Sequence, residues 1–151
     1  YAHRGDFPWE EVIDASLRAS MATEGDLPYL VELMEGEHPV LRYWGALGCL
    51  VLRDRSAKAA PVLEQLTKDP HAANRITALH ALARIELSER SLAALVHEAT
   101  STTSDPAAAL ALHTLYQLEA SEKIPPAELE RLEASAELPY AARWAKRFNR
   151  H

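Results

Sequence analysis

The stretch Arg42-Tyr43-Trp44-Gly45-Ala46-Leu47-Gly48-Cys49 returns twice along this chain. It reappears as Arg75-Ile76-Thr77-Ala78-Leu79-His80-Ala81-Leu82 and again as Ala108-Ala109-Leu110-Ala111-Leu112-His113-Thr114-Leu115, so each copy starts 33 positions after the one before (42, 75, 108). The fourth and seventh places of the copies hold small residues, namely Gly45/Gly48, Ala78/Ala81 and Ala111/Thr114. Small residues at fixed places allow packed helices to approach closely, and self-similarity at this period indicates a repeat architecture.

Each copy follows a shorter amphipathic stretch, so the repeating unit is predicted to be helix, turn, helix. Proline is predicted in the first turn of each second helix, where its missing N–H costs nothing, with Asp69 and Asp105 able to cap free amides. A helix from about Pro8 to Thr23, capped by Asp6 and ended by Gly25, precedes the repeats. The predicted segments are the lead segment 1–25 and the helix pairs 26–52, 56–86, 88–120 and 125–148, the last containing Pro126–Ala134 and Pro139–Phe148.

Composition agrees with an all-helical chain and limits the classes of function. The 151 residues include 27 Ala and 22 Leu, both strong helix formers. The net charge of −6, without a long basic run, argues against binding to bare nucleic acid or to an anionic membrane. No apolar run is long enough to span a bilayer, and the lone Cys49 can form no internal disulfide, so we expect it in the core.

These units predict an all-α fold, a right-handed α-solenoid of about nine helices in one domain over residues 1–151. The second helices resemble the HEAT-like repeat, in which Val-Arg precedes a run of alanines and leucines. Val40 to Gly48 and Asn74 to Leu82 come close to that pattern, whereas the third copy lacks the Arg and the fourth is degenerate. Degenerate end repeats are typical of solenoids, because an end repeat must present a polar outer face.

A more specific resemblance lies in a combination of segments. The Gly5-Asp6-Phe7-Pro8-Trp9 lead, one long helix and then Pro39 to Gly48 is similar to the C-terminal helical region of bacterial sulfatases of the arylsulfatase-like and heparan N-sulfatase-like kind. The resemblance implies an exported, secreted or periplasmic, parent enzyme that cleaves sulfate esters or sulfamates of glycans. It also implies that this chain lacks the active site, since Cys49 and Arg53 have the spacing of a Cys/Ser-x-Pro-x-Arg nucleophile motif but Val51 replaces the proline.

The chain begins without Met and without a signal-peptide core, so we expect a fragment or a processed chain. No cofactor or metal is expected. His80 and His113 occupy equivalent places on adjacent second helices, yet no third ligand accompanies them. We therefore expect both to be solvated or hydrogen-bonded surface side chains.

One row of side chains on the second helices is a candidate docking surface. The third, sixth and tenth places of successive copies read Trp44/Leu47/Val51, Thr77/His80/Arg84 and Leu110/His113/Gln117, so the row begins apolar and becomes polar. Solenoid packing does not by itself require apolar residues there, and something must cover them. Either the lead helix covers them with Phe7, Trp9, Val12 and Ile13, or a partner does. The candidate residues are Tyr43, Trp44, Leu47, Val51, His80, Arg84 and His113.

Two classes of function remain open at this point. One is a non-catalytic C-terminal module of a secreted sulfatase that docks to the upstream catalytic domain of the same protein. The other is a free-standing adaptor that binds another protein, as repeat solenoids commonly do.

Overall fold

The computed structural model describes residues 7–101, 104–118 and 123–134, and within these ranges all regular secondary structure is helical. Two short 3₁₀ segments, η1 (Glu24–Asp26) and η2 (Arg53–Ala59), accompany the α-helices. The α-helices are α1 (Trp9–Ser20), α2 (Leu27–Glu35), α3 (Pro39–Leu52), α4 (Ala60–Leu66), α5 (Ala72–Ile85), α6 (Glu89–Ser101), α7 (Asp105–Gln117) and α8 (Pro126–Ala134).

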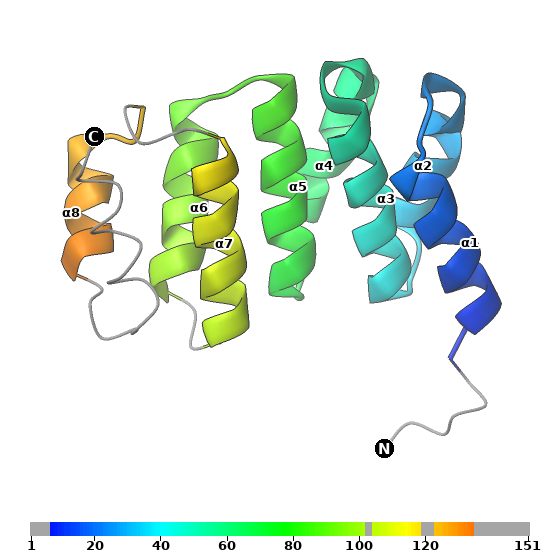
Figure 1. Ribbon diagram of the computed structural model, residues 1–151, viewed down its shortest axis with the longest axis horizontal. Coiled ribbons are helices and arrows are strands. Elements are labelled where there is room, and N and C mark those ends of the chain that lie inside the picture. The colour runs from blue at the N-terminus through cyan, green and yellow to red at the C-terminus, as the bar shows by residue number, and fades with distance from the viewer. Residues whose placement is uncertain (1–6, 102–103, 119–122, 135–151) are drawn as a thin grey trace.

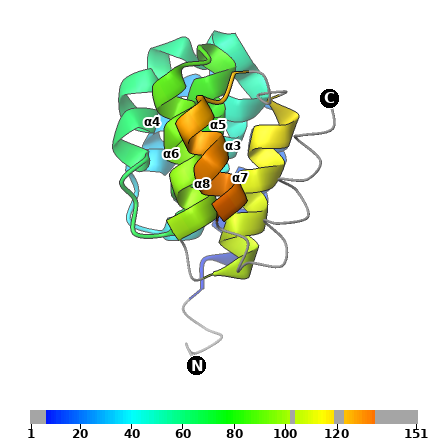
Figure 2. The same cartoon turned by 90° about the vertical axis from the view of Figure 1, so that its left-hand side faces the viewer.

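The helices stack in two layers (Figure 1). The second helices α3, α5 and α7 form one layer together with α1, and α2, α4, α6 and α8 form the other. Figure 2 looks along the stack from the α8 end, where α7 lies beside the layer that contains α6 and α8. The predicted all-α solenoid is confirmed, and the lead helix α1 takes the place of a second helix at the edge of its layer.

Several helix limits differ from the sequence-based expectation. Helix α5 begins at Ala72, so Pro70 lies in the turn before it rather than in its first turn. The reason is local: the Asp69 carboxylate accepts a hydrogen bond from the His71 N–H at 2.8 Å and thereby sets the helix start two residues later. Helix α1 ends at Ser20 instead of Thr23. The expected cap Asp6 and the expected helix Pro139–Phe148 lie outside the described residues.

Arg42, the first residue of the repeated stretch, joins three parts of the structure. Its Nη1 donates to the backbone carbonyls of Gly36 at 3.1 Å and Glu37 at 2.6 Å, in the turn between α2 and α3. Its Nε donates to the Asp69 carboxylate at 2.6 Å, in the turn before α5. The guanidinium of Arg42 therefore bonds both to the turn within its own repeat and to the turn of the next repeat.

Arg75 repeats this arrangement one unit later. Its Nη1 donates to the carbonyls of Asp69 and Pro70 at 2.9 and 3.1 Å, the same offsets along the chain as in the first copy. Its Nε and Nη2 bind the two oxygens of Glu98 on α6 at 2.6 and 2.8 Å, a bidentate pair. The third copy has Ala108 at this place, so the series of arginine brackets ends there.

Close helix approach within the first pair depends on two glycines. A Cβ atom at Gly45 would lie 2.6 Å from the Leu30 carbonyl oxygen and 2.7 Å from the Met34 Cγ. A Cβ at Gly48 would overlap both terminal methyl groups of Leu30, which is itself fully buried. The small residues noted in the repeat thus allow α3 to lie directly against α2.

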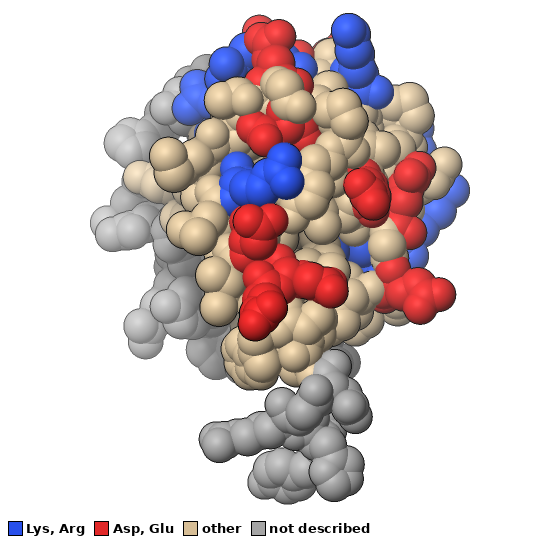
Figure 3. Space-filling view, turned by 90° about the vertical axis from the view of Figure 1, so that its right-hand side faces the viewer, with Lys and Arg blue, Asp and Glu red and all other residues tan. Residues whose placement is uncertain are grey.

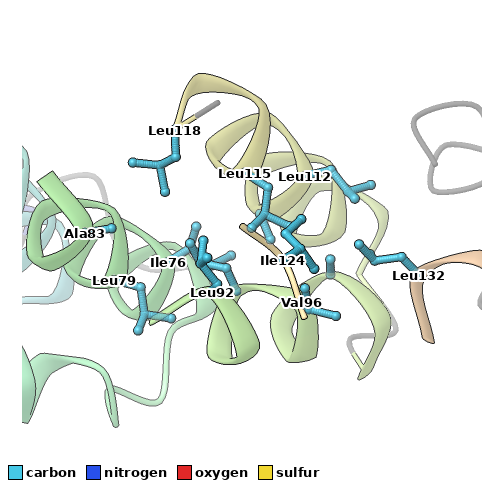
Figure 4. Close-up of a cluster of buried hydrophobic side chains, with 13 residues drawn as sticks. Ile76, Leu79, Ala83, Leu92, Val96, Leu112, Leu115, Leu118, Ile124 and Leu132 are labelled. Atoms are coloured by element: carbon cyan, nitrogen blue, oxygen red, sulfur yellow. The ribbon is translucent and has the colours of Figure 1, made fainter. Parts of the chain in front are cut away.

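Two apolar clusters fill the space between the layers. The first extends from α1 to α5 and includes Cys49, which is completely buried as expected; burial raises the pKa of its thiol to about 12 and leaves it uncharged. The second joins α5, α6, α7 and α8 and includes the fully buried Leu92, Leu112 and Leu115 (Figure 4). Ile76 and Leu79 of α5 belong to this second cluster while Ala78 and Ala81 belong to the first, so α5 connects them.

The glycine contact generates a test in which the sign of the effect matters. Glycine to alanine inside a helix ordinarily stabilises by about 1 kcal/mol. We expect Gly48→Ala instead to destabilise by about 1–3 kcal/mol, because the new methyl group overlaps Leu30. The measurement is the free energy of unfolding in urea. Gly25→Ala is the matched control: its Cβ would meet only Thr23 Oγ1 at 3.7 Å, so we expect no loss, and a stabilised Gly48→Ala would contradict the packing described.

The arginine bracket generates a second test. Arg42→Lys keeps the charge but cannot donate at once to the Asp69 carboxylate and two carbonyls, since ammonium lacks the planar fork. We expect a loss of about 1–3 kcal/mol in unfolding free energy. Arg90→Lys serves as the control, because the exposed Arg90 lies 3.7 Å from Glu64 and such pairs contribute less than about 1 kcal/mol. Equal losses at both positions would argue against the bracket.

Candidate interaction surface

The candidate surface begins on the side of α3 that is turned away from its buried residues. Ala46 and Cys49 are fully buried in the first cluster, and the helical period places Leu47 and Val51 on the opposite side. Val51 is 40% exposed, and Leu47 is half-buried. This part of the layer offers apolar atoms to solvent.

Tyr43 and Trp44 complete the apolar part of this surface. Both are half-buried, and their rings meet edge to face with centroids 5.4 Å apart. Trp44 also packs against the first apolar cluster. Trp44 therefore serves both the core and the surface, and only its exposed part is available to a partner.

The residues of α5 that correspond to Trp44 and Leu47 are buried. Thr77 and His80 are 6% and 7% exposed, which corrects the expectation that His80 is a solvated surface residue. The prediction assumed that every second helix has one side in solvent. Helix α5, which lies between α3 and α7, is buried along most of its length. The row of candidate residues is therefore interrupted at its middle repeat.

His80 is an unusual core residue. Its Nε2 is buried without a hydrogen-bond partner among the residues that the structure describes. Burial, together with the positive charges of Arg84 and His113, lowers the pKa of His80 to about 4. The imidazole is consequently neutral at pH 7.

The remaining two candidates have different environments. Arg84 donates from Nη2 to the Gln117 backbone carbonyl at 2.8 Å, so it binds the last turn of α7 and ties two repeats together. His113 is exposed, as expected. Of the seven candidates only His80 is buried, and Arg84 is half-buried and bonded to the next repeat.

The lead helix does not cover the candidate surface in the expected way. Helix α1 packs against α3, with Ala15 and Ala19 fully buried. Coverage of the α3 row by the lead helix was one of the two alternatives, and its large side chains Trp9 and Ile13 are 59% and 55% exposed. Short alanines permit the closer packing of the two helices, so that side of α1 faces inward and the large side chains face solvent.

The described residues contain neither a cluster of metal ligands nor a membrane-spanning helix. No group of three or more His, Cys, Asp or Glu side chains there is arranged to hold a metal ion. None of the helices in the described ranges is both long enough and apolar enough to cross a lipid bilayer.

The sequence predicted Asp69 as a cap of free amides but not its ion pair with Arg42. Burial alone would raise the pKa of Asp69, but hydrogen bonds from Arg42, the His71 N–H and Asn74 outweigh it and lower the pKa to about 2. Asn74 also donates to the Pro39 carbonyl at 3.1 Å, a further bond between repeats. The recurrence of Arg at positions 42 and 75 could have predicted this ion pair, because an Arg kept at the same place in two repeats is a candidate hydrogen-bond donor between them.

Comparison with known proteins identifies the family. A model of HEAT repeats matches residues 27–116, more than half of the chain. The chain belongs to the HEAT-repeat family. No curated protein and no solved structure matches it.

The buried imidazole generates a pH test. Between pH 6.5 and 4 the unfolded chain binds a proton at residue 80 while the folded chain does not. The free energy of unfolding therefore decreases as the pH is lowered through this window, and the loss is complete near pH 4. The shift from 6.5 to about 4 corresponds to a loss of about 3 kcal/mol. His80→Leu should remove this part of the pH dependence.

The control is His97→Gln, since His97 is exposed and is not one of the groups that lower the pKa of His80. Unfolding free energy measured in urea from pH 7 to pH 4 should keep the wild-type slope in this control. If the dependence of unfolding free energy on pH were the same in His80→Leu as in the wild type, the burial of His80 would not be the source of this pH dependence.

Proposed function

We propose that residues 1–151 form a single non-catalytic HEAT-repeat module that binds protein through the solvent-facing side of α3. The observation that carries the proposal is the apolar character of this side, where Tyr43, Trp44, Leu47 and Val51 are only partly covered. Thr77 and His80 at the equivalent places of the next repeat are polar, so the stack does not require apolar residues there. A partner that covers the α3 side would remove exposed apolar area from water.

The finer proposal concerns the partner. The similarity of the Gly5–Trp9 lead and the Pro39–Gly48 stretch to sulfatase C-terminal regions supports an upstream catalytic domain of the same protein as the occupant. The parent would then be an exported hydrolase of sulfated glycans, and this module would buttress its catalytic domain. The alternative partner is a separate protein, which makes the module an adaptor.

Domain docking is tested by placing a charge on the α3 side. In the natural full-length protein, Val51→Glu should separate the module from an upstream domain, because a carboxylate cannot be buried there unpaired. We expect limited proteolysis just before Phe7 to become roughly tenfold faster, while the melting temperature of the isolated chain changes little, since Val51 is 40% exposed. Ala57→Glu, an exposed position on η2, is the control and should change neither quantity.

The identity of the parent is tested separately. A natural gene whose upstream region encodes Cys/Ser-x-Pro-x-Arg, and whose product releases sulfate from an aryl sulfate, would support the sulfatase proposal. The isolated chain should release none, and turnover that disappears on Cys49→Ala would overturn the assignment of this module as non-catalytic. A full-length product without such a domain would contradict the sulfatase proposal and favour the alternative, an adaptor that binds a separate protein.

A further inference from the structure

A second apolar surface lies at the opposite side of α1, away from the stack. Trp9, Ile13, Leu17 and Met21 recur at intervals of four residues and are 59%, 55%, 61% and 78% exposed. This spacing places them along one side of the helix, across from the buried Ala15. We call these four residues the α1 stripe.

A groove runs beside the α1 stripe at the end of the stack. Its volume is about 450 Å³. Buried or half-buried leucines and a tyrosine form its apolar part, and exposed carboxylates form its rim. The lining residues are Leu33, Leu41, Tyr29, Glu10, Glu11 and Asp14.

The charge of this end is strongly negative. Residues 7–38 contain eight acidic side chains and one Arg, namely Glu10, Glu11, Asp14, Glu24, Asp26, Glu32, Glu35 and Glu37 against Arg18. Arg18 pairs with Asp26 at 3.2 Å and lies 3.7 Å from the centre of the Tyr29 ring. Within the described part of the chain, no cationic group pairs with Glu10 or Glu11. Figure 3 looks onto this end and shows the acidic groups on it.

These charges decide between possible occupants. A second copy of the chain would bring two acidic ends together, and an anionic lipid surface would also be repelled. A basic segment is attracted by the same field. Lysine and arginine suit the groove in particular, because their aliphatic stems can lie on Leu33 and Leu41 while the charged ends reach the rim carboxylates.

We propose that the α1–α2 end binds a basic amphipathic helix of a partner protein, whose apolar side packs on the α1 stripe and whose Lys or Arg side chains enter the groove. From Trp9 to Met21 the stripe covers twelve helical steps, about 18 Å, which matches a partner helix of roughly three turns. The bound helix would lie beside α1 much as α3 does on its other side. This site is independent of the α3 side and does not require the proposed function.

The test uses the full chain and a defined probe. The probe is a fluorescein-labelled peptide of about 18 residues made of Ala, Leu and Lys, with leucine at every fourth position and lysines beside the leucines. Binding is followed by fluorescence anisotropy at low salt. We expect saturable one-to-one binding that weakens as salt is added, and no binding of the same peptide with every Lys replaced by Glu.

Two protein variants separate the apolar and the charged contributions. Ile13→Ser/Leu17→Ser and Glu10→Gln/Glu11→Gln should each raise the dissociation constant at least about tenfold. Their melting temperatures should stay near that of the wild type, since all four side chains are exposed. Glu86→Gln/Glu89→Gln removes the same charge from exposed positions far along the chain and should leave the affinity within about twofold.

Three results would overturn the proposal. The Glu-containing peptide could bind as well as the Lys-containing one, or the Glu86→Gln/Glu89→Gln control could lose as much affinity as the Glu10→Gln/Glu11→Gln variant, which would indicate general charge attraction. Sedimentation could also show a dimer of the chain that dissociates in Ile13→Ser/Leu17→Ser. In that case the occupant of the α1 stripe is a second copy.

Discussion

The hydrogen bonds of Arg42 and Arg75 determine how one repeat is placed on the next. Each guanidinium binds two carbonyls of the turn inside its own repeat and one carboxylate of the following repeat. The carboxylates of Asp69 and Glu98 are largely buried, with 3% and 11% of the side chain exposed, so neither could be left without its cation. Helix pairs joined only by apolar contacts could slide along one another, whereas these polar contacts have one register.

The same hydrogen bonds explain why the side chains of α5, in the middle of the layer of second helices, are buried. Once Arg42, Asn74 and Arg75 fix α5 between its neighbours, nearly every side of α5 is covered, including Thr77 and His80. Arg84 then donates to the carbonyl of Gln117, the last residue of α7, and extends the connection to the third repeat. Partner surfaces are consequently left on the outward side of α3, between α1 and α5, and on α1, which is the edge of the layer.

The sequence predicted the fold more reliably than the candidate surface. Repeat period, helix type and the small residues at Gly45 and Gly48 follow from local pattern, and the structure uses them as the pattern indicates. The environment of a given side chain depends instead on the neighbouring repeat, which a pattern within one helix does not contain. His80 shows this: its position along α5 matches that of the half-buried Leu47 on α3, yet α5 has neighbours that close over it. The sequence likewise left open whether Trp9 and Ile13 cover α3, and the structure buries Ala15 and Ala19 of the lead helix instead.

The two apolar surfaces differ in charge, and this difference has a consequence for how each can be occupied. Around the α1 stripe the carboxylates of α1 and α2 far outnumber the single Arg18, so a partner there must bring positive charge. On the α3 side Val51 is followed by Arg53 and Arg55, both exposed, and no acidic residue lies between Pro39 and Arg53. One partner helix therefore cannot satisfy both surfaces equally well. Because α1 lies between them, the module can hold two different segments on either side of one helix, each selected by the charge beside an apolar row.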